Sequence, residues 1–180
     1  MALAGLGWLA GADAAEVPVP ALAGCLRGLE QALAVHTAAR ARILAAFTAR
    51  RGHEDDGQGS PRTWLTWQTR ITRPAASAAA GWMRRLAGHP ALAAALARAE
   101  ISQSWARQIA DWTDQLPAGA RADADLILLA AAAGRAGLDA RAGLAEEIRR
   151  RAAGPDRDDD GFHPPRPAEM RGVLTLADYA

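Results

Sequence analysis

Apolar side chains recur at helical spacing along the first third of this chain. Eight positions between residues 21 and 51 step by three and four residues, as on one face of a helix: Leu22, Leu26, Leu29, Leu33, His36, Arg40, Ile43 and Phe47. The stripe becomes polar at His36 and Arg40. Val35 and Ala39 stand beside them and continue the apolar surface. We therefore predict a long first helix that spans the core, in preference to a dimeric coiled coil. Gly52 follows where a helix C-cap is expected.

Start and stop signals divide the following residues into six shorter helices, which are the second to the seventh predicted helix of the chain. Four of these begin at residues that cap or open helices: Ser60–Pro61, Thr72, Pro90 and Ser102. The sixth helix has Asp123 and Asp125 in its first turn, where the helix dipole favours acids, and it ends at Gly134. The seventh spans about 139–152. The pattern predicts an all-α fold, a compact array of about seven helices.

The fifth predicted helix carries Trp105, Ile109 and Trp112 at helical spacing. Ser102 is placed to cap this helix and Pro117 to end it. We expect Trp105 and Trp112, two turns apart, to be buried against the first helix. Together with the helix before it, this helix fits either an ordinary αα-hairpin, the commoner arrangement, or a DNA-binding helix-turn-helix.

A family resemblance lies in the same stretch. It is carried by LARAEISQSWARQIA at residues 96–110 and by QLP at 115–117. These segments resemble the middle of the actinobacterial thirteen-E-twelve repeat family (domain of unknown function 222), whose helical module usually stands upstream of an HNH endonuclease module. Three further segments support the resemblance, which covers about residues 22–176: 59–65, 82–89 and 122–129. It implies a helical module associated with nucleases, and it carries over no catalytic residue.

Charge is distributed unevenly, although the net charge is only +1. All 21 basic residues are arginine, and the chain has neither lysine nor asparagine, a bias that indicates a GC-rich coding sequence before it indicates a function. Residues 60–99 hold six arginines and no acid, whereas 52–59 carry a charge of −3. The acid-free segment is therefore the part of the chain best suited to an anionic partner.

Arginine and tryptophan are interleaved in this segment, a combination that suits phosphates and bases. Its tryptophans are Trp64, Trp67 and Trp82. The primary candidates for contact with double-stranded DNA surround the third helix: Arg70, Arg73, Arg84 and Arg85. Arg62 and Arg98 are secondary, and Arg107 joins them if the helix-turn-helix interpretation holds. In the alternative, the tryptophans are core residues and the arginines form a solvated face that the acids at 54–56 partly neutralise.

No catalytic residue, metal site or cofactor is predicted. An HNH nuclease needs an asparagine and paired histidines, but asparagine is absent and the four histidines stand on different predicted elements: His36, His53, His89 and His163. Residues 156–161, DRDDDG, match the opening of a calcium loop, yet the twelfth position is Pro167 instead of a bidentate glutamate. We interpret them as an acidic linker, and we expect a non-enzymatic chain.

The single cysteine and the chain ends bear on the cellular compartment. Cys25 alone excludes an internal disulfide and a zinc site built on several cysteines, and it fits a reducing cytoplasm. A signal peptide requires a basic residue before its apolar region, and none precedes the apolar residues 1–12. No apolar run approaches the roughly 20 residues that span a bilayer. We expect a cytoplasmic protein without a membrane segment.

Three parts are predicted: a loosely ordered lead-in (1–20), a helical domain (21–153) and an acidic Pro/Gly/Asp linker (154–180) with one short strand at 171–176. The chain is expected to stop before a further module. We favour a non-catalytic module that contacts or positions DNA. The alternative is protein interaction or oligomerisation through the long first helix, with a second copy or an HNH nuclease module as partner.

Overall fold

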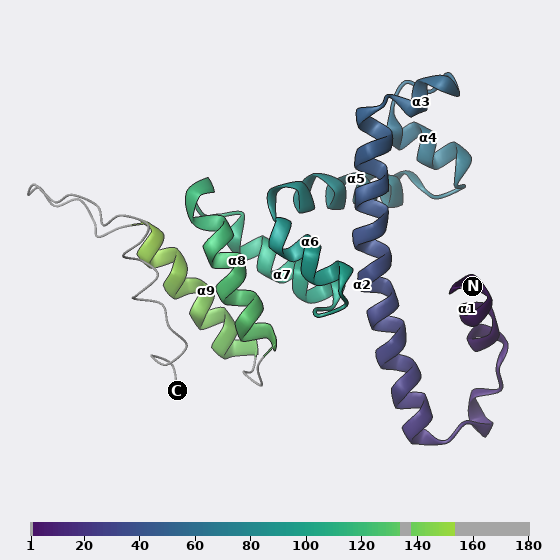
Figure 1. The fold of residues 1–180 in the computed structure, drawn as a ribbon, viewed down its shortest axis with the longest axis horizontal. Helices are drawn as coiled ribbons and strands as arrows, with labels where there is room; N and C mark the ends of the chain where they lie inside the picture. Colours follow the sequence, from purple (N-terminus) through teal and green to yellow (C-terminus); the bar gives the residue numbers. More distant parts are fainter. Residues whose placement is uncertain (1, 134–137, 154–180) are drawn as a thin grey trace, which may run out of the picture.

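The computed structural model describes residues 2–133 and 138–153 (Figure 1). Within these ranges the chain is all-α, as predicted, and contains one 3₁₀ turn, η1 (Ala14–Glu16), and no strand. The helices are α1 (Ala2–Gly11), α2 (Val19–Ala49), α3 (Gly52–Asp55), α4 (Pro61–Gln68), α5 (Arg73–Gly88), α6 (Pro90–Ala97), α7 (Gln103–Thr113), α8 (Ala118–Ala133) and α9 (Leu138–Ala153). The predicted linker and its strand lie outside the described residues.

Local capping sets the starts of α4 to α7. The hydroxyl oxygen of each predicted cap accepts a hydrogen bond from the N–H group three residues later, at 3.1 Å for Ser60, 3.4 Å for Thr72 and 3.3 Å for Ser102. Pro61 and Pro90 occupy the first positions of α4 and α6, where an N–H group would lack a helical partner. These four predicted starts are confirmed.

α8 begins earlier than predicted. Its first residue is Ala118, directly after Pro117, whose carbonyl accepts a hydrogen bond from the Ala120 N–H group at 2.9 Å. Asp123 and Asp125 therefore lie inside the helix, and the helix dipole does not account for them. Asp125 is instead completely buried, with 0% of its surface exposed.

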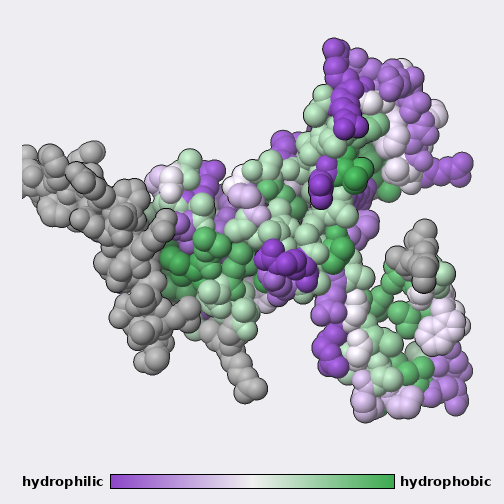
Figure 2. All heavy atoms as spheres, in the orientation of Figure 1, coloured by the Kyte–Doolittle hydropathy of each residue, from purple (hydrophilic) through white to green (hydrophobic). Residues whose placement is uncertain are grey.

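The N-terminal stretch, predicted to be loosely ordered, forms α1 and η1. Asp13 caps η1 by accepting a hydrogen bond from the Ala15 N–H group at 3.0 Å. α1 is almost wholly apolar, and Figure 2 shows green, apolar atoms at the surface in this part of the molecule. Its Trp8 is 70% exposed. Neither α1 nor any other described helix is long and apolar enough to cross a membrane. Because α1 precedes it, the long helix α2 is the second helix of the chain and not the first, as was predicted.

α2 buries a different face from the predicted stripe. Its buried residues lie in the C-terminal half and are mostly small: Ala34, Thr37, Ala38, Ala41 and Leu44. Leu26 and Ile43 of the stripe are 65% and 69% exposed. α5 and α6 pack against α2. Small side chains allow close approach of helices, so the alanines of α2, and not its leucines, lie in this contact. The N-terminal half extends beyond α5 and α6 (Figure 1).

Two clusters of buried side chains make up the core. The larger joins α2 with α5–α9 and centres on four residues that are at most 2% exposed: Leu92, Leu96, Ile109 and Leu128. The smaller contains Leu44 and Leu65 and lies where α2, α4 and α5 meet. Beside it, the ring centroids of Phe47 and Trp64 are 4.5 Å apart. The two clusters fix α4 and α5 against the upper half of α2 in Figure 1.

Gly52 has a packing role in place of the predicted C-cap role. The left-handed residue after α2 is Arg51, with φ of 58°, and Gly52 already begins α3. A Cβ atom at position 52 would stand 2.5 Å from the ring of Phe47. Glycine is required there because the Phe47 ring, held against Trp64, leaves no room for a side chain.

α7 buries a face shifted by one residue from the prediction. Its buried residues are Ala106, Ile109, Ala110 and Thr113. Trp105 and Trp112 are only half-buried, at the edge of the larger cluster. Arg141 of α9 lies over Trp105, with its guanidinium carbon 4.3 Å from the ring centroid. The expectation that both tryptophans are fully buried against the long helix is therefore wrong.

Candidate nucleic-acid interface and a buried polar network

Six of the seven candidate arginines are exposed. Four of these lie on α4, on α5 and on the turn between them. They are Arg62, Arg70, Arg73 and Arg84, and none forms an ion pair with another residue in the described part of the chain. Arg73 and Arg84 lie on the same side of α5, about three turns and about 16 Å apart at 1.5 Å per residue. Arg70 has a left-handed backbone with φ of 53°. We call these four residues the α4–α5 basic face.

The other three candidates are engaged by neighbours within the fold. A nitrogen of Arg85 lies 2.5 Å from Asp111 and 2.9 Å from Asp114. Arg98 donates to both carboxylate oxygens of Glu100, at 2.5 and 2.8 Å. The guanidinium carbon of Arg107 lies 5.7 Å from the ring centroid of Trp82. A phosphate would have to compete with two carboxylates at Arg85 and one at Arg98, so these residues are weaker candidates than the basic face.

The three tryptophans of the segment have different surroundings. Trp82 is buried in the larger cluster at 9% exposure. Trp64 contacts Phe47, and its indole N–H group donates to Asp56 at 2.5 Å. Trp67 is 72% exposed. Only Trp67, among the tryptophans of residues 60–99, offers an open ring face for stacking.

The nearby acids do not neutralise the basic face through ion pairs. Glu54 lies 2.7 Å from Arg51, which precedes it by one helical turn. Asp56 accepts hydrogen bonds from Trp64 and, at 3.3 Å, from Gln68. These contacts hold α3 and its loop against α4. Residues 54–56 therefore make no ion pair with the four arginines of the α4–α5 basic face within the described part of the chain.

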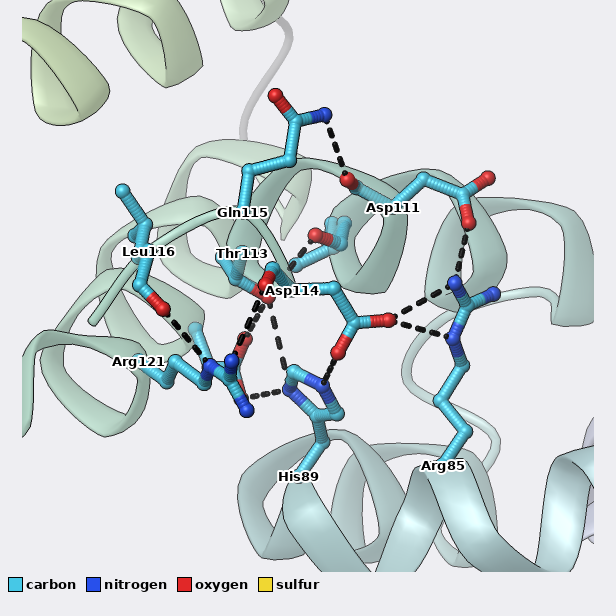
Figure 3. A network of polar contacts seen from close by, with 10 residues as sticks. Arg85, His89, Asp111, Thr113, Asp114, Gln115, Leu116 and Arg121 are labelled. Carbon is cyan, nitrogen blue, oxygen red and sulfur yellow. Dashed lines mark hydrogen bonds and ion pairs between the residues drawn. The ribbon is translucent and has the colours of Figure 1, made fainter. Parts of the chain in front are cut away.

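A buried polar network lies at the junction of α5 and α6, centred on His89 (Figure 3). His89 is 1% exposed. Its Nδ1 atom is 2.8 Å from Asp125 and its Nε2 atom 3.0 Å from Asp114. A carboxylate only accepts hydrogen bonds, and a neutral imidazole donates from one nitrogen alone. Both ring nitrogens of His89 face a carboxylate oxygen, and which of them donates depends on the tautomer of the ring.

The network continues on both sides of His89. The Thr113 hydroxyl donates to Asp125 at 2.8 Å, and Arg85 donates to Asp114 from two nitrogens, at 2.9 and 3.0 Å. Partial burial pushes the pKa of Asp114 upward. The hydrogen bonds from His89 and Arg85 outweigh that effect, so the pKa of Asp114 lies below its ordinary value of 3.8. Hydrogen-bonded side chains thus run from Arg85 at the surface through Asp114 and His89 to Asp125 in the interior.

Further polar contacts surround the C-terminal end of α7. Arg121 of α8 donates to the backbone carbonyls of Leu116 and Asp114 at 3.0 and 3.1 Å. Gln115 donates to the backbone carbonyl of Asp111 at 3.0 Å. These donors satisfy carbonyl groups that a helix end leaves without partners. The network therefore joins the α5–α6 junction, the end of α7 and the start of α8.

This arrangement joins three parts of the fold around a buried ring. Both ring nitrogens of His89 are engaged and the ring is inaccessible, so it presents no base to a substrate. Sequence reasoning missed the network because it treated His89 as one of four scattered histidines and Asp125 as a helix-start acid. A signal was available: Asp125 directly precedes the apolar run 126–133, and an acid on an apolar helix face needs a buried partner.

Metal ligands do not gather in the described residues, where no group of three or more His, Cys, Asp or Glu side chains could hold an ion. The calcium-like segment 156–161 and His163 lie outside the described residues. No family model, no curated protein and no solved structure matches this chain, so its function has to be inferred from its own residues.

Proposed function

We propose that this chain is a non-catalytic helical module that contacts or positions double-stranded DNA through the α4–α5 basic face. The observation that carries the proposal is the exposure of Arg62, Arg70, Arg73 and Arg84 without ion-pair partners among the described residues. The resemblance of residues 96–110 to a family that accompanies HNH endonucleases points in the same direction. In this proposal the module acts in the cytoplasm, and a nuclease, if present, belongs to another module.

The spacing of the arginines suits a phosphate backbone. A duplex carries one charge per about 1.7 Å of axis, so the roughly 16 Å between Arg73 and Arg84 along α5 corresponds to several phosphates. Phosphate contacts position a protein but read no sequence. The proposed binding is therefore driven by counterion release and has little sequence preference.

A salt titration tests this proposal. Duplex DNA is titrated at several salt concentrations with the parent chain and with Arg73→Ala/Arg84→Ala. Each lost phosphate contact should reduce the salt slope by about 0.9, so the double variant should lose up to about twice that value. The matched control is Arg51→Ala/Arg149→Ala, which removes the same charge from two exposed arginines that are not candidates for DNA contact and are already paired with Glu54 and Glu146.

Two results would contradict the proposal. The first is a parent chain that does not bind duplex DNA at low salt. The second is an equal loss of binding by the control variant, because the effect would then follow net charge and not this face. Circular dichroism verifies that both variants keep the parent's helix content.

The alternative function, protein interaction through α2, is supported by a separate observation. The leucine stripe in the N-terminal half of α2 is exposed, with Leu26 at 65%. DNA binding weakens with salt, whereas helix-mediated association follows protein concentration. The two functions are therefore measured independently, and both can operate in one chain.

A further inference from the structure

We propose that two copies of this chain associate through the N-terminal halves of α2, packed antiparallel along five apolar residues. These residues, which we call the α2 seam, are Val19, Leu22, Leu26, Leu29 and Leu33. The inference rests on α2 alone and does not depend on the proposed DNA contact.

Four of the five α2 seam residues are exposed, and Leu22 is half-buried. Val19 and Leu26 are 76% and 65% exposed, and Leu29 and Leu33 are 39% and 41% exposed. None of the five belongs to either core cluster. The buried residues of α2 begin at Ala34, after the seam ends. This half of α2 extends beyond α5 and α6, and α1 lies to one side of it (Figure 1).

The spacing of the seam identifies the shape of the missing partner. Its residues alternate steps of three and four, which are the a and d positions of two heptads. Such a row of side chains fits into the holes of a like helix, whereas a flat surface would contact it poorly. The seam contains no charged side chain. A second copy of α2 supplies the matching row.

Charges beside the seam favour the antiparallel direction. Arg27 and Glu30 are exposed and form no ion pair with a described residue. They occupy b and e positions on the same side of the seam. In an antiparallel pair that places Leu26 against Leu29 of the second copy, this side of each helix meets the same side of the other. Arg27 then lies about two residues, or about 3 Å along the axis, from Glu30 of the second copy.

A parallel pair lacks this complementarity. There, e positions face g positions of the other helix, so Glu30 would face Cys25 of the second copy. Arg27, at a b position, would point away from the interface. The two directions therefore respond differently to charge reversal at these residues.

The interface is small, which sets the expected strength. Stable interfaces bury on the order of 800 Å² per partner, and two heptads of one helix supply less than that. The helix is already formed as part of α2, so association does not have to order it first. We expect a weak dimer whose population rises with protein concentration.

Sedimentation velocity of the full chain over about a hundredfold range of concentration measures this association. Leu26→Gln should raise the dimer dissociation constant by at least about tenfold, because it places a polar group at the centre of the seam. The matched control is Leu126→Gln on α8, where the leucine is 58% exposed and lies off the seam. The control should associate like the parent.

Orientation is tested by mixing two charge variants, Arg27→Glu and Glu30→Arg. In the antiparallel pair, each variant alone brings like charges together, whereas the mixture brings opposite charges together in both the 27–30 and the 30–27 pair. The mixture should therefore associate more tightly than either variant alone, by about two- to fivefold for exposed pairs. A mixture that associates no better than its components would overturn the antiparallel arrangement.

Other outcomes overturn the association itself. A parent that stays monomeric at the highest concentration, or a Leu126→Gln control as weakened as Leu26→Gln, would exclude the α2 seam as a dimer interface. If Leu26→Gln lowers the melting temperature of a monomeric parent, a segment of the same chain covers the seam. Loss of DNA binding in the salt titration would leave all of these results unchanged.

Discussion

Replacing His89 by alanine is the sharpest test of the buried network. The His89 ring bridges two carboxylates, and the variant leaves Asp125, at 0% exposure, with the Thr113 hydroxyl as its hydrogen-bond donor among the described residues. Removing one partner of a buried ion pair typically costs about 3–5 kcal/mol, because the remaining charge stays buried without compensation. A domain is commonly stable by about 5–15 kcal/mol, so His89→Ala should lose a large share of the stability.

Urea and thermal unfolding followed by circular dichroism measure this loss. For a domain of this size, about 3–5 kcal/mol corresponds to a fall in melting temperature of roughly 10–15 °C. The matched control is Asp111→Ala, which removes an acid from the exposed end of the same network, where the side chain is 47% exposed. Exposed pairs contribute at most about 1 kcal/mol, so the control should unfold close to the parent.

A double substitution separates the cost of a broken pair from the value of the pair itself. His89→Leu/Asp125→Leu removes both interior charges, and apolar replacement of a whole buried pair is often neutral or stabilising. The double variant should therefore be more stable than His89→Ala. If His89→Ala unfolds within about 1 kcal/mol of the Asp111→Ala control, the His89 ring does not hold the α5–α6 junction and the interpretation of the network is wrong.

Two further predictions concern the core and acid stability. Ile109→Ala, at 1% exposure, should cost about 2–5 kcal/mol, and half-buried Trp105→Ala should cost less; urea unfolding that ranks them the other way would place Trp105 at the centre of the core. Because the pKa of Asp114 is lower in the folded chain than its ordinary 3.8, its contribution is complete at neutral pH and is lost as pH falls below that value through the folded-state pKa. The stability difference between the parent and Asp114→Asn should shrink in that acidic range, and a difference independent of pH would contradict the ion-pair assignment.

Helix positions could be predicted because capping is local. Ser60, Thr72 and Ser102 each bond an N–H group only three residues away, so the sequence around them contains both partners. The start of α8 was placed too late because two acids close together, such as Asp123 and Asp125, are also typical of the first turn of a helix. Their neighbourhood in the fold, not their order in the chain, distinguishes a dipole-favoured acid from a buried one.

The buried faces could not be predicted, because periodicity shows that a helix has an apolar face without showing what covers it. The leucines of α2 have the stronger pattern, but α5 and α6 pack on Ala34, Ala38 and Ala41. Close approach of helices favours small side chains over large ones. The large side chains of the α2 seam remain outside the core. The sequence showed their spacing, but only the structure shows that they are exposed.

The sequence by itself determined the all-α class, the starts of α4 to α7 and the position of the acid-free arginine segment, since each depends on composition or on residues one turn apart. Tertiary structure decided which arginines of this segment are exposed without an ion-pair partner among the described residues. Arg85 meets Asp111 and Asp114 from 26 and 29 residues away, and His89 meets Asp125 from 36 residues away. Contacts over such separations form only after helices pack, because the intervening chain has no local reason to bring those side chains together.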